Sequence, residues 1–301
     1  VNCVMSDPPR WTTPENVALI AALRENLRAE HRIDTSSDPR LWLTGDVRLL
    51  RFLEGHGCDP AAAGAAFAAM MAERKSAHCD ADEIAGRLVA AAARFPGEEM
   101  SFNKYLEVAV DSDVALVRRV RAALPAVEQF ADTRDKLDLS DVLFFGKADV
   151  AMLLAPELGE AGLAQYYTLV LEHRSMLLDS RSRRSGQMAK LLMIRDFEGL
   201  SLGMLQPRAM RVVSARLGWI QRCFPEFARA ILLVNTPWAF AAAWRMVSGL
   251  LNARTKERVQ AFSAKELPEA RARLLEFVDA SVLPKRWGGE ADDACCLPPI
   301  P

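Results

Sequence analysis

The sequence predicts an α/β protein in which a helical N-terminal lobe precedes a mixed or parallel β-sheet covered by helices. Helical apolar spacing dominates the first 130 residues, whereas short apolar runs alternate with helical segments after that point. Strands that are apolar throughout indicate a sheet with both faces covered. A chain of 301 residues is long enough to bury a sizeable core.

The first 130 residues contain several helix signals. Thr13 and Pro14 form a capping hydroxyl followed by proline at the first helical position, and apolar residues recur at helical spacing after them. "GDVRLLRFLEGHG" predicts a second helix, and Asp59-Pro60 begins an alanine-rich third one. Two more helices are expected over 80–95 and 113–124. We therefore expect this lobe to be entirely helical.

The remaining chain alternates between strands and helices. Apolar runs bounded by turn residues predict strands at 141–150, 190–197 and 229–237, and the segment 257–263 follows the last predicted strand and its helix. Helical segments are expected at 162–178, 206–224, 238–251 and 268–279. The polar, proline-rich end at 291–301 is expected to be a flexible tail.

Composition limits the classes of function. The 38 Lys and Arg residues balance 39 Asp and Glu residues, which argues against a nucleic-acid-binding protein. No apolar run reaches the ~18 residues of a spanning helix, and "VNCVMSDPPR" lacks the apolar core of a secretory signal. Six cysteines in so long a chain do not resemble a disulfide framework, so a reduced, cytoplasmic setting is expected.

The segment "GLSLG" at 199–203 matches the G-x-S-x-G nucleophile elbow of hydrolases, with Ser201 as the nucleophile. That fold places its histidine after the serine, whereas all four histidines of this chain precede Ser201. We therefore interpret the segment as a strand-to-helix turn and keep hydrolysis as a remote alternative.

Two other polar groups have ordinary explanations. His56, Cys58, His78 and Cys79 lack zinc spacing and border one helix of about 25 Å at opposite ends, so no metal site is expected. "RSRRS" at 181–185 is interpreted as a solvated turn, and contact with anionic headgroups is the alternative.

The stretch "ILLVNTPWAFAAAWRMVSGLL" at 231–251 combines a strand, a break at Pro237 and a strongly apolar helix. At about 100° per residue, one side of that helix carries Phe240, Trp244, Val247 and Leu251. Packing in the protein core and the wall of an apolar pocket both require large apolar residues. The pattern leaves both interpretations open.

The segment 224–262, from "FPEFARAILLVNTP" to "LLNARTKERVQAF", resembles the core signature of the CRAL-TRIO lipid-binding family. That family includes retinaldehyde-binding, tocopherol-transfer and phosphatidylinositol-exchange proteins. Four more segments follow in family order: "LLRFLEGHGCDPAAAGAAF", "DVLFFGKAD", "KLLMIRDFEGLSL" and "LPKRWGG". Together they extend over residues 41–289, although 77–136 resembles nothing in the family and is expected to be a divergent linker.

The resemblance implies a helical lobe at 1–130 and a lipid-binding domain at 131–290 whose sheet forms the floor of a hydrophobic pocket. The helix after the N-x-P turn would be a movable gate. Such proteins bind one lipid and transfer or present it at membranes, and they are generally not enzymes. The implied partners are a lipid and, transiently, a membrane surface, with no cofactor. A lipid-responsive regulator without bulk transfer is the alternative.

The family's headgroup positions correspond to Glu226, Thr255 and Arg258. Each has a purely structural alternative: the first turn of a local helix, an N-cap for "KERVQ", and a surface cation, respectively. His56 and Gly57 replace the family's basic pair. This departure argues against phosphatidylinositol as the ligand, because it removes cations that would face a phosphorylated headgroup.

Overall fold

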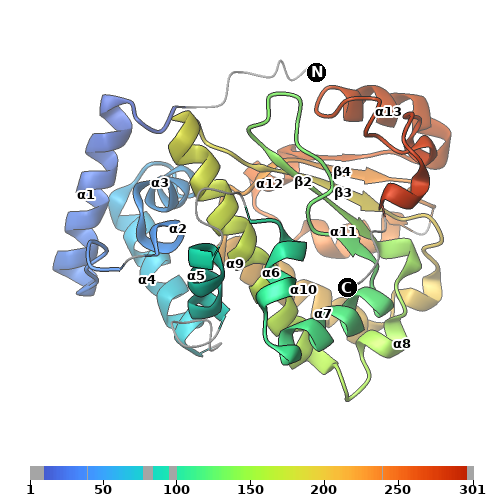
Figure 1. The fold of residues 1–301 in the computed structure, drawn as a ribbon, viewed down its shortest axis with the longest axis horizontal. Coiled ribbons are helices and arrows are strands. Elements are labelled where there is room, and N and C mark those ends of the chain that lie inside the picture. Colours follow the sequence, from blue (N-terminus) through green and yellow to red (C-terminus); the bar gives the residue numbers. More distant parts are fainter. Residues whose placement is uncertain (1–9, 39, 77–83, 95–99, 239, 297–301) are drawn as a thin grey trace.

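The computed structural model describes residues 10–38, 40–76, 84–94, 100–238 and 240–296. Figure 1 shows a group of N-terminal helices beside a five-stranded sheet, with α9 (Gly159–Ser185) running between them. α9 contacts helices of the N-terminal group, and buried residues from Ile20 to Phe227 form one continuous core. The predicted α/β fold class is confirmed.

The N-terminal helices begin largely where the sequence predicts. Thr13 Oγ1 accepts a hydrogen bond from the amide of Asn16 at 3.3 Å and caps the first helix. Two short helices were not predicted, because four and seven residues are too few to show a helical period. The helices are α1 (Pro14–His31), α2 (Leu41–Thr44), α3 (Asp46–Gly55), α4 (Pro60–Ser76), α5 (Ile84–Arg94), α6 (Phe102–Val108) and α7 (Asp111–Ala123).

The sheet has the strand order β1-β2-β3-β4-β5, with β1 antiparallel to β2 and all other pairs parallel. Its strands are β1 (Ala126–Val127), β2 (Leu139–Phe144), β3 (Leu191–Asp196), β4 (Ala228–Val234) and β5 (Val259–Ala261). The expectation of an all-helical first 130 residues is therefore wrong at β1, which is too short to be recognised from its sequence.

The strand expected at 141–150 also ends early, at Phe144, and residues Phe145–Lys147 form a 3₁₀ turn (η1). The turn lies against the loop that follows β3. A Cβ atom at Gly146 would lie 2.0 Å from the carbonyl oxygen of Glu198, so only glycine permits this approach.

The two faces of the sheet have different neighbours. Alternate strand residues pack against α13 (Leu267–Leu275) in a small core: Val142, Phe144, Leu192, Ile194, Ala230, Leu232 and Val234. The intervening residues, among them Leu143, Met193 and Leu233, face a cavity on the other side. This period of two is the signature of extended strands.

The remaining helices are α8 (Val150–Leu153), α10 (Pro207–Cys223), α11 (Phe240–Ser248) and α12 (Ala253–Glu257). The interpretation of 181–185 as a solvated turn is wrong, because these residues are the last turn of α9. Arg181 is buried there and donates to the carbonyl of Asp138 at 2.9 Å. Of the expected tail, residues 291–296 are described, and the amide of Arg286 donates to Asp293 at 2.8 Å.

Candidate functional site

A cavity of about 350 Å³ lies between the sheet and helices α9, α10 and α11. Its wall is largely apolar, with leucine, methionine, phenylalanine and tryptophan side chains from all of these elements. Ligand pockets in proteins commonly measure roughly 300–1,000 Å³ and combine an apolar wall with a few polar groups. The cavity therefore has the size and the composition of a site for an apolar ligand.

Helix α11 forms part of this wall. All four residues predicted on its apolar side line the cavity and are half-buried: Phe240, Trp244, Val247 and Leu251. The helix ends at Ser248, so Leu251 reaches the cavity from the turn beyond it. The ring of Phe240 lies 4.9 Å from that of Phe197 and stacks on Trp244 at 5.9 Å. Their role as a gate remains a prediction.

The turn before α11 is held by Asp196 at the end of β3. Asn235 adopts a left-handed φ of 56°, which asparagine tolerates better than most residues. Its side-chain amide donates to Asp196 at 3.0 Å, and the indole of Trp287 donates to the same carboxylate at 3.1 Å. The buried carboxylate thus fixes the strand end from which α11 departs.

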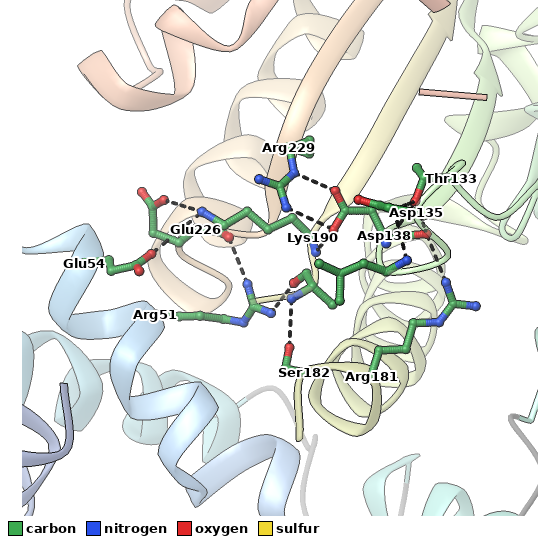
Figure 2. A network of polar contacts seen from close by, with 12 residues as sticks. Arg51, Glu54, Thr133, Asp135, Asp138, Arg181, Ser182, Lys190, Glu226 and Arg229 are labelled. Carbon is green, nitrogen blue, oxygen red and sulfur yellow. Dashed lines mark hydrogen bonds and ion pairs between the residues drawn. The ribbon is translucent and has the colours of Figure 1, made fainter. Parts of the chain in front are cut away.

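Glu226 lies at the opposite end of the cavity, at the start of β4, and three cations surround its carboxylate. The Lys190 ammonium lies 3.3 Å away and the Arg254 Nε 3.2 Å away, and Arg258 donates a short hydrogen bond. Lys190 also approaches Glu54 at 3.7 Å, as Figure 2 shows. We call Glu54, Lys190, Glu226, Arg254 and Arg258 the Glu226 cluster.

The electrostatics of the Glu226 cluster keep its central carboxylate ionised. Burial alone would raise the pKa of Glu226, but the hydrogen bond from Arg258 and the charges of Lys190 and Arg254 hold it below the ordinary value. Glu226 has a φ of 58°, so it is not in the first turn of a helix. Uncommon backbone conformations of this kind cluster at functional sites.

Thr255 and Arg258 line the same cavity as Glu226. The structural alternative for Thr255, an N-cap, does not apply, because Asn252 is the N-cap of α12 and its Oδ1 accepts from the Thr255 amide at 2.8 Å. Arg258 is bound to Glu226 and is not an isolated surface cation. The structure thus brings all three candidate headgroup residues to one end of one cavity.

Comparison with known proteins agrees with this arrangement. A model of the CRAL/TRIO domain matches residues 147–289, which include the strands β3 to β5, α11 and the Glu226 cluster residues of that region. This segment of the chain, residues 147–289, belongs to the CRAL-TRIO family.

Relatives in this lipid-binding family are distant. Protein real-time of Drosophila pseudoobscura pseudoobscura is 25% identical over 149 residues, which are 49% of this chain and 22% of that protein. The CRAL-TRIO domain-containing protein F28H7.8 of Caenorhabditis elegans is 29% identical over 111 residues, 36% of this chain and 25% of that protein. The chain thus matches a quarter or less of the length of these relatives.

The crystal structure of Sfh5 shows the same fold. It superposes with a TM-score of 0.58 at 11% sequence identity, over 92% of this chain and 86% of Sfh5. The similarity therefore includes the helical lobe, where the family model has no match.

Several charged residues at this cavity were missed in the sequence. Lys190 and Arg254 belong to the Glu226 cluster, and Arg174 and Arg195 line the cavity elsewhere. Lys190 immediately precedes β3 and Arg195 lies near its end, and a cation beside or within a largely apolar strand is the one signal that could have pointed to them. The others required the fold, because they come from segments far apart in the chain.

The positions that depart from the family pattern lie at the end of α3. The His56 ring nitrogen Nδ1 lies 2.8 Å from the carbonyl oxygen of Phe52, and Gly57 adopts a positive φ of 68°. His78 and Cys79 lie outside the described residues. Within the described residues, no group of three or more His, Cys, Asp or Glu side chains could hold a metal ion.

Ser201 lies exposed in the loop between β3 and α10. His56 and His173 each place one ring nitrogen on a backbone carbonyl, of Phe52 and Met100. Among the residues that the structure describes, no hydrogen bond joins a histidine to Ser201. Proteins of this family are generally not enzymes. The remote hydrolase alternative thus gains no support from the geometry.

Proposed function

We propose that this protein binds a single lipid in the cavity and transfers or presents it at membranes. The observation that carries the proposal is the apolar cavity between the sheet and α11, with the Glu226 cluster at one end. Membership of a lipid-binding family supports it. The proposal places the helical lobe before about residue 130 and the lipid-binding domain after it.

The physical basis is the cost of exposing hydrocarbon to water. A lipid tail leaving a bilayer loses about 0.8 kcal/mol for each methylene that water surrounds. The leucine, methionine and phenylalanine side chains of the cavity offset this loss. A helix that covers the cavity must then move for the lipid to enter, and α11 with Trp244 and Phe240 is the element we assign to that movement.

The Glu226 cluster is the proposed headgroup site, with Glu226, Thr255 and Arg258 as its central residues. Its three cations and two carboxylates leave one net positive charge, and Arg51 adds another cation that donates to the Glu226 carbonyl at 3.0 Å. The cations missing at positions 56 and 57 are thus offset by cations from other elements. An anionic or strongly polar headgroup fits this charge.

Trp238 is the proposed membrane contact. It precedes α11, and 82% of the surface of this residue is exposed. Tryptophan is enriched at membrane–water interfaces because its ring is apolar and its indole N–H is polar. None of the described helices is both long and apolar enough to cross a bilayer. The proposed contact through Trp238 is peripheral and transient.

A regulator that binds lipid without transferring it is the second candidate. The observation that favours it is the group α5, α6 and α7, which lies in the segment that does not resemble the family and which packs against α9 through α5 and α7. In this candidate function, the exposed side of these helices would bind a partner protein.

Vesicle assays separate the two candidates. Donor vesicles carrying a fluorescent phospholipid are mixed with unlabelled acceptor vesicles and the purified chain, and the rate of exchange is followed. Accelerated exchange supports transfer, whereas lipid binding without accelerated exchange supports the regulator. Absence of both binding and exchange contradicts the proposed function.

A further inference from the structure

A second polar group lies on the cavity wall, away from the Glu226 cluster. Arg174 of α9 and Arg195 of β3 both line the cavity, and both bind the carboxylate of Asp141 in β2. Arg195 makes two hydrogen bonds to it, at 3.0 and 3.1 Å, and Arg174 approaches at 2.8 Å. Asp141 itself does not line the cavity, so the guanidinium groups stand between the carboxylate and the ligand space.

These two arginines lie at the α11 end of the cavity. Arg195 is two residues before Phe197, whose ring packs on Phe240 of α11. Lys190 of the Glu226 cluster lies five residues before Arg195 on the same extended segment, a separation of about 16 Å. The cavity therefore has two charged ends, and each has its own cations.

The charges at the α11 end do not balance. Two guanidinium groups share one carboxylate, which leaves one net positive charge, and the side chains of Arg174, Arg195 and Asp141 are only 10%, 14% and 4% exposed. The Nε of Arg174 is buried without a hydrogen-bond partner. A buried cation without a matching anion is costly unless a ligand or solvent compensates it.

Tyr167 adds a hydrogen-bond donor at the same place. It lines the cavity about two turns before Arg174 on α9. Within the described part of the chain its hydroxyl has no hydrogen-bond partner. Burial raises the pKa of Tyr167, although the charges of Arg195 and Arg174 oppose that effect. The hydroxyl therefore keeps its proton at neutral pH and can donate it to an oxygen atom.

We propose that Arg174, Arg195 and Tyr167 form a site for the carboxylate of an acidic, long-chain lipid. This inference rests on the proposed lipid-binding function and names a ligand class for the same cavity. A carboxylate presents two oxygens in one plane, and guanidinium groups match that geometry. The apolar wall takes the hydrocarbon chain, and the net positive charge of the Arg174–Asp141–Arg195 group receives the negative charge of the acid.

The test compares one hydrocarbon chain with and without the acid. The purified chain, stripped of lipid, is titrated at neutral pH with the fluorescent fatty acid cis-parinaric acid and with its methyl ester. The acid is expected to bind at least about tenfold more tightly, because only the acid makes charge-assisted hydrogen bonds to the arginines.

Two substitutions should move this preference in opposite directions. Arg174→Met removes the surplus charge and leaves Asp141 bound by Arg195, so the preference for the acid should fall toward one while the ester binds as before. Asp141→Asn removes the competing carboxylate, so the preference should rise. Tyr167→Phe should lower it several-fold. Arg211→Met, at an exposed position of α10 outside the cavity, is the matched control and should change nothing.

The outcomes separate this site from the proposed function. Equal affinity of the wild-type chain for the acid and the ester overturns the carboxylate site but leaves lipid binding intact. A preference for the acid that survives Arg174→Met and Tyr167→Phe also overturns it, because another group then recognises the acid. If neither probe binds, the proposed lipid-binding function itself fails.

Discussion

The carboxylate of Glu226 lies 3.3 Å from the ammonium group of Lys190, and only 4% and 7% of these side chains are exposed. The two residues are 36 positions apart, one before β3 and one before β4. Neighbouring parallel strands bring them together at the same edge of the sheet. An ion pair so deeply buried is costly to break, because the remaining partner stays uncompensated.

Replacing the central carboxylate should therefore affect both stability and binding. Glu226→Gln is expected to lower the free energy of unfolding by roughly 2–3 kcal/mol, because Lys190 and Arg258 lose their shared anion and Glu54 compensates only Lys190. Urea denaturation measures the loss. Glu257→Gln, at an exposed position of α12, is the control. A Glu226 variant as stable as that control would show that the cluster contributes nothing to folding.

The same carboxylate predicts a loss of stability in acid. Its pKa in the folded chain lies below the ordinary value of 4.5, so the ionised form is favoured by folding. This contribution is complete above pH 4.5 and is lost as the pH falls below it. Below pH 4.5, unfolding free energy should fall less steeply in Glu226→Gln than in the wild type.

His173 should give a separate pH dependence at higher pH. Burial lowers its pKa from 6.5 to about 4, and a ring nitrogen hydrogen-bonds to the Met100 carbonyl at 2.8 Å. Between pH 4 and pH 6.5, His173 therefore binds a proton in the unfolded chain but not in the folded chain. Stability is full above pH 6.5 and should decline by about 3 kcal/mol as the pH falls toward 4.

Measurements between pH 6.5 and 5 isolate this histidine from the carboxylates. The midpoint of urea denaturation should fall across that range in the wild type, and the slope should be smaller in His173→Gln, whose amide can still donate to the Met100 carbonyl. Identical slopes for the two proteins would contradict the prediction.

Trp244 tests the role of α11. Because Trp244 is half-buried and lines the cavity, Trp244→Ala should lower lipid exchange several-fold per folded molecule while costing about 1 kcal/mol of stability. Phe52→Ala, in the fully buried core, is the contrasting variant and should cost roughly 3–5 kcal/mol with exchange per folded molecule unchanged. If Trp244→Ala behaves as Phe52→Ala does, α11 is ordinary core and not a gate.

Trp238 tests the proposed membrane contact. Trp238→Ala should weaken binding to phospholipid vesicles several-fold, with no change in the melting temperature, because the exposed ring makes little contact within the chain. Val17→Ala is the control, since Val17 is an exposed apolar residue of α1, in the helical lobe away from the cavity. Co-sedimentation with vesicles measures both variants. Equal losses would point to non-specific hydrophobic adsorption.

Much of the fold could be predicted from local patterns. The long helices α1, α4 and α10 and the strands β3 and β4 have either capping signals or apolar runs that their neighbours do not override. The errors arose where tertiary contacts determine the local secondary structure. β1 exists only by pairing with β2, and 181–185 remains helical because Arg181 binds Asp132 and the carbonyl of Asp138.

The candidate site was predictable where its residues are close in sequence. The periodicity of α11 placed its apolar residues on one side, and the resemblance pointed to Glu226, Thr255 and Arg258. Lys190, Arg174 and Asp141 were missed because they meet the cavity or its arginines only through the packing of β2, β3 and α9. The local periodicity of a sequence carries no information on contacts between residues that are far apart in the chain.

The central claim is that the cavity under α11 holds a lipid, and an organic extract of the purified chain tests it most directly. The protein is isolated from cells by gel filtration without detergent, extracted, and its lipids are quantified by mass spectrometry against the amount of protein. We predict one lipid molecule per chain in the wild type. We predict fewer than one per chain when Trp244 or Glu226 is replaced. A protein that is folded but carries no lipid, and that takes up none from vesicles, would contradict the account.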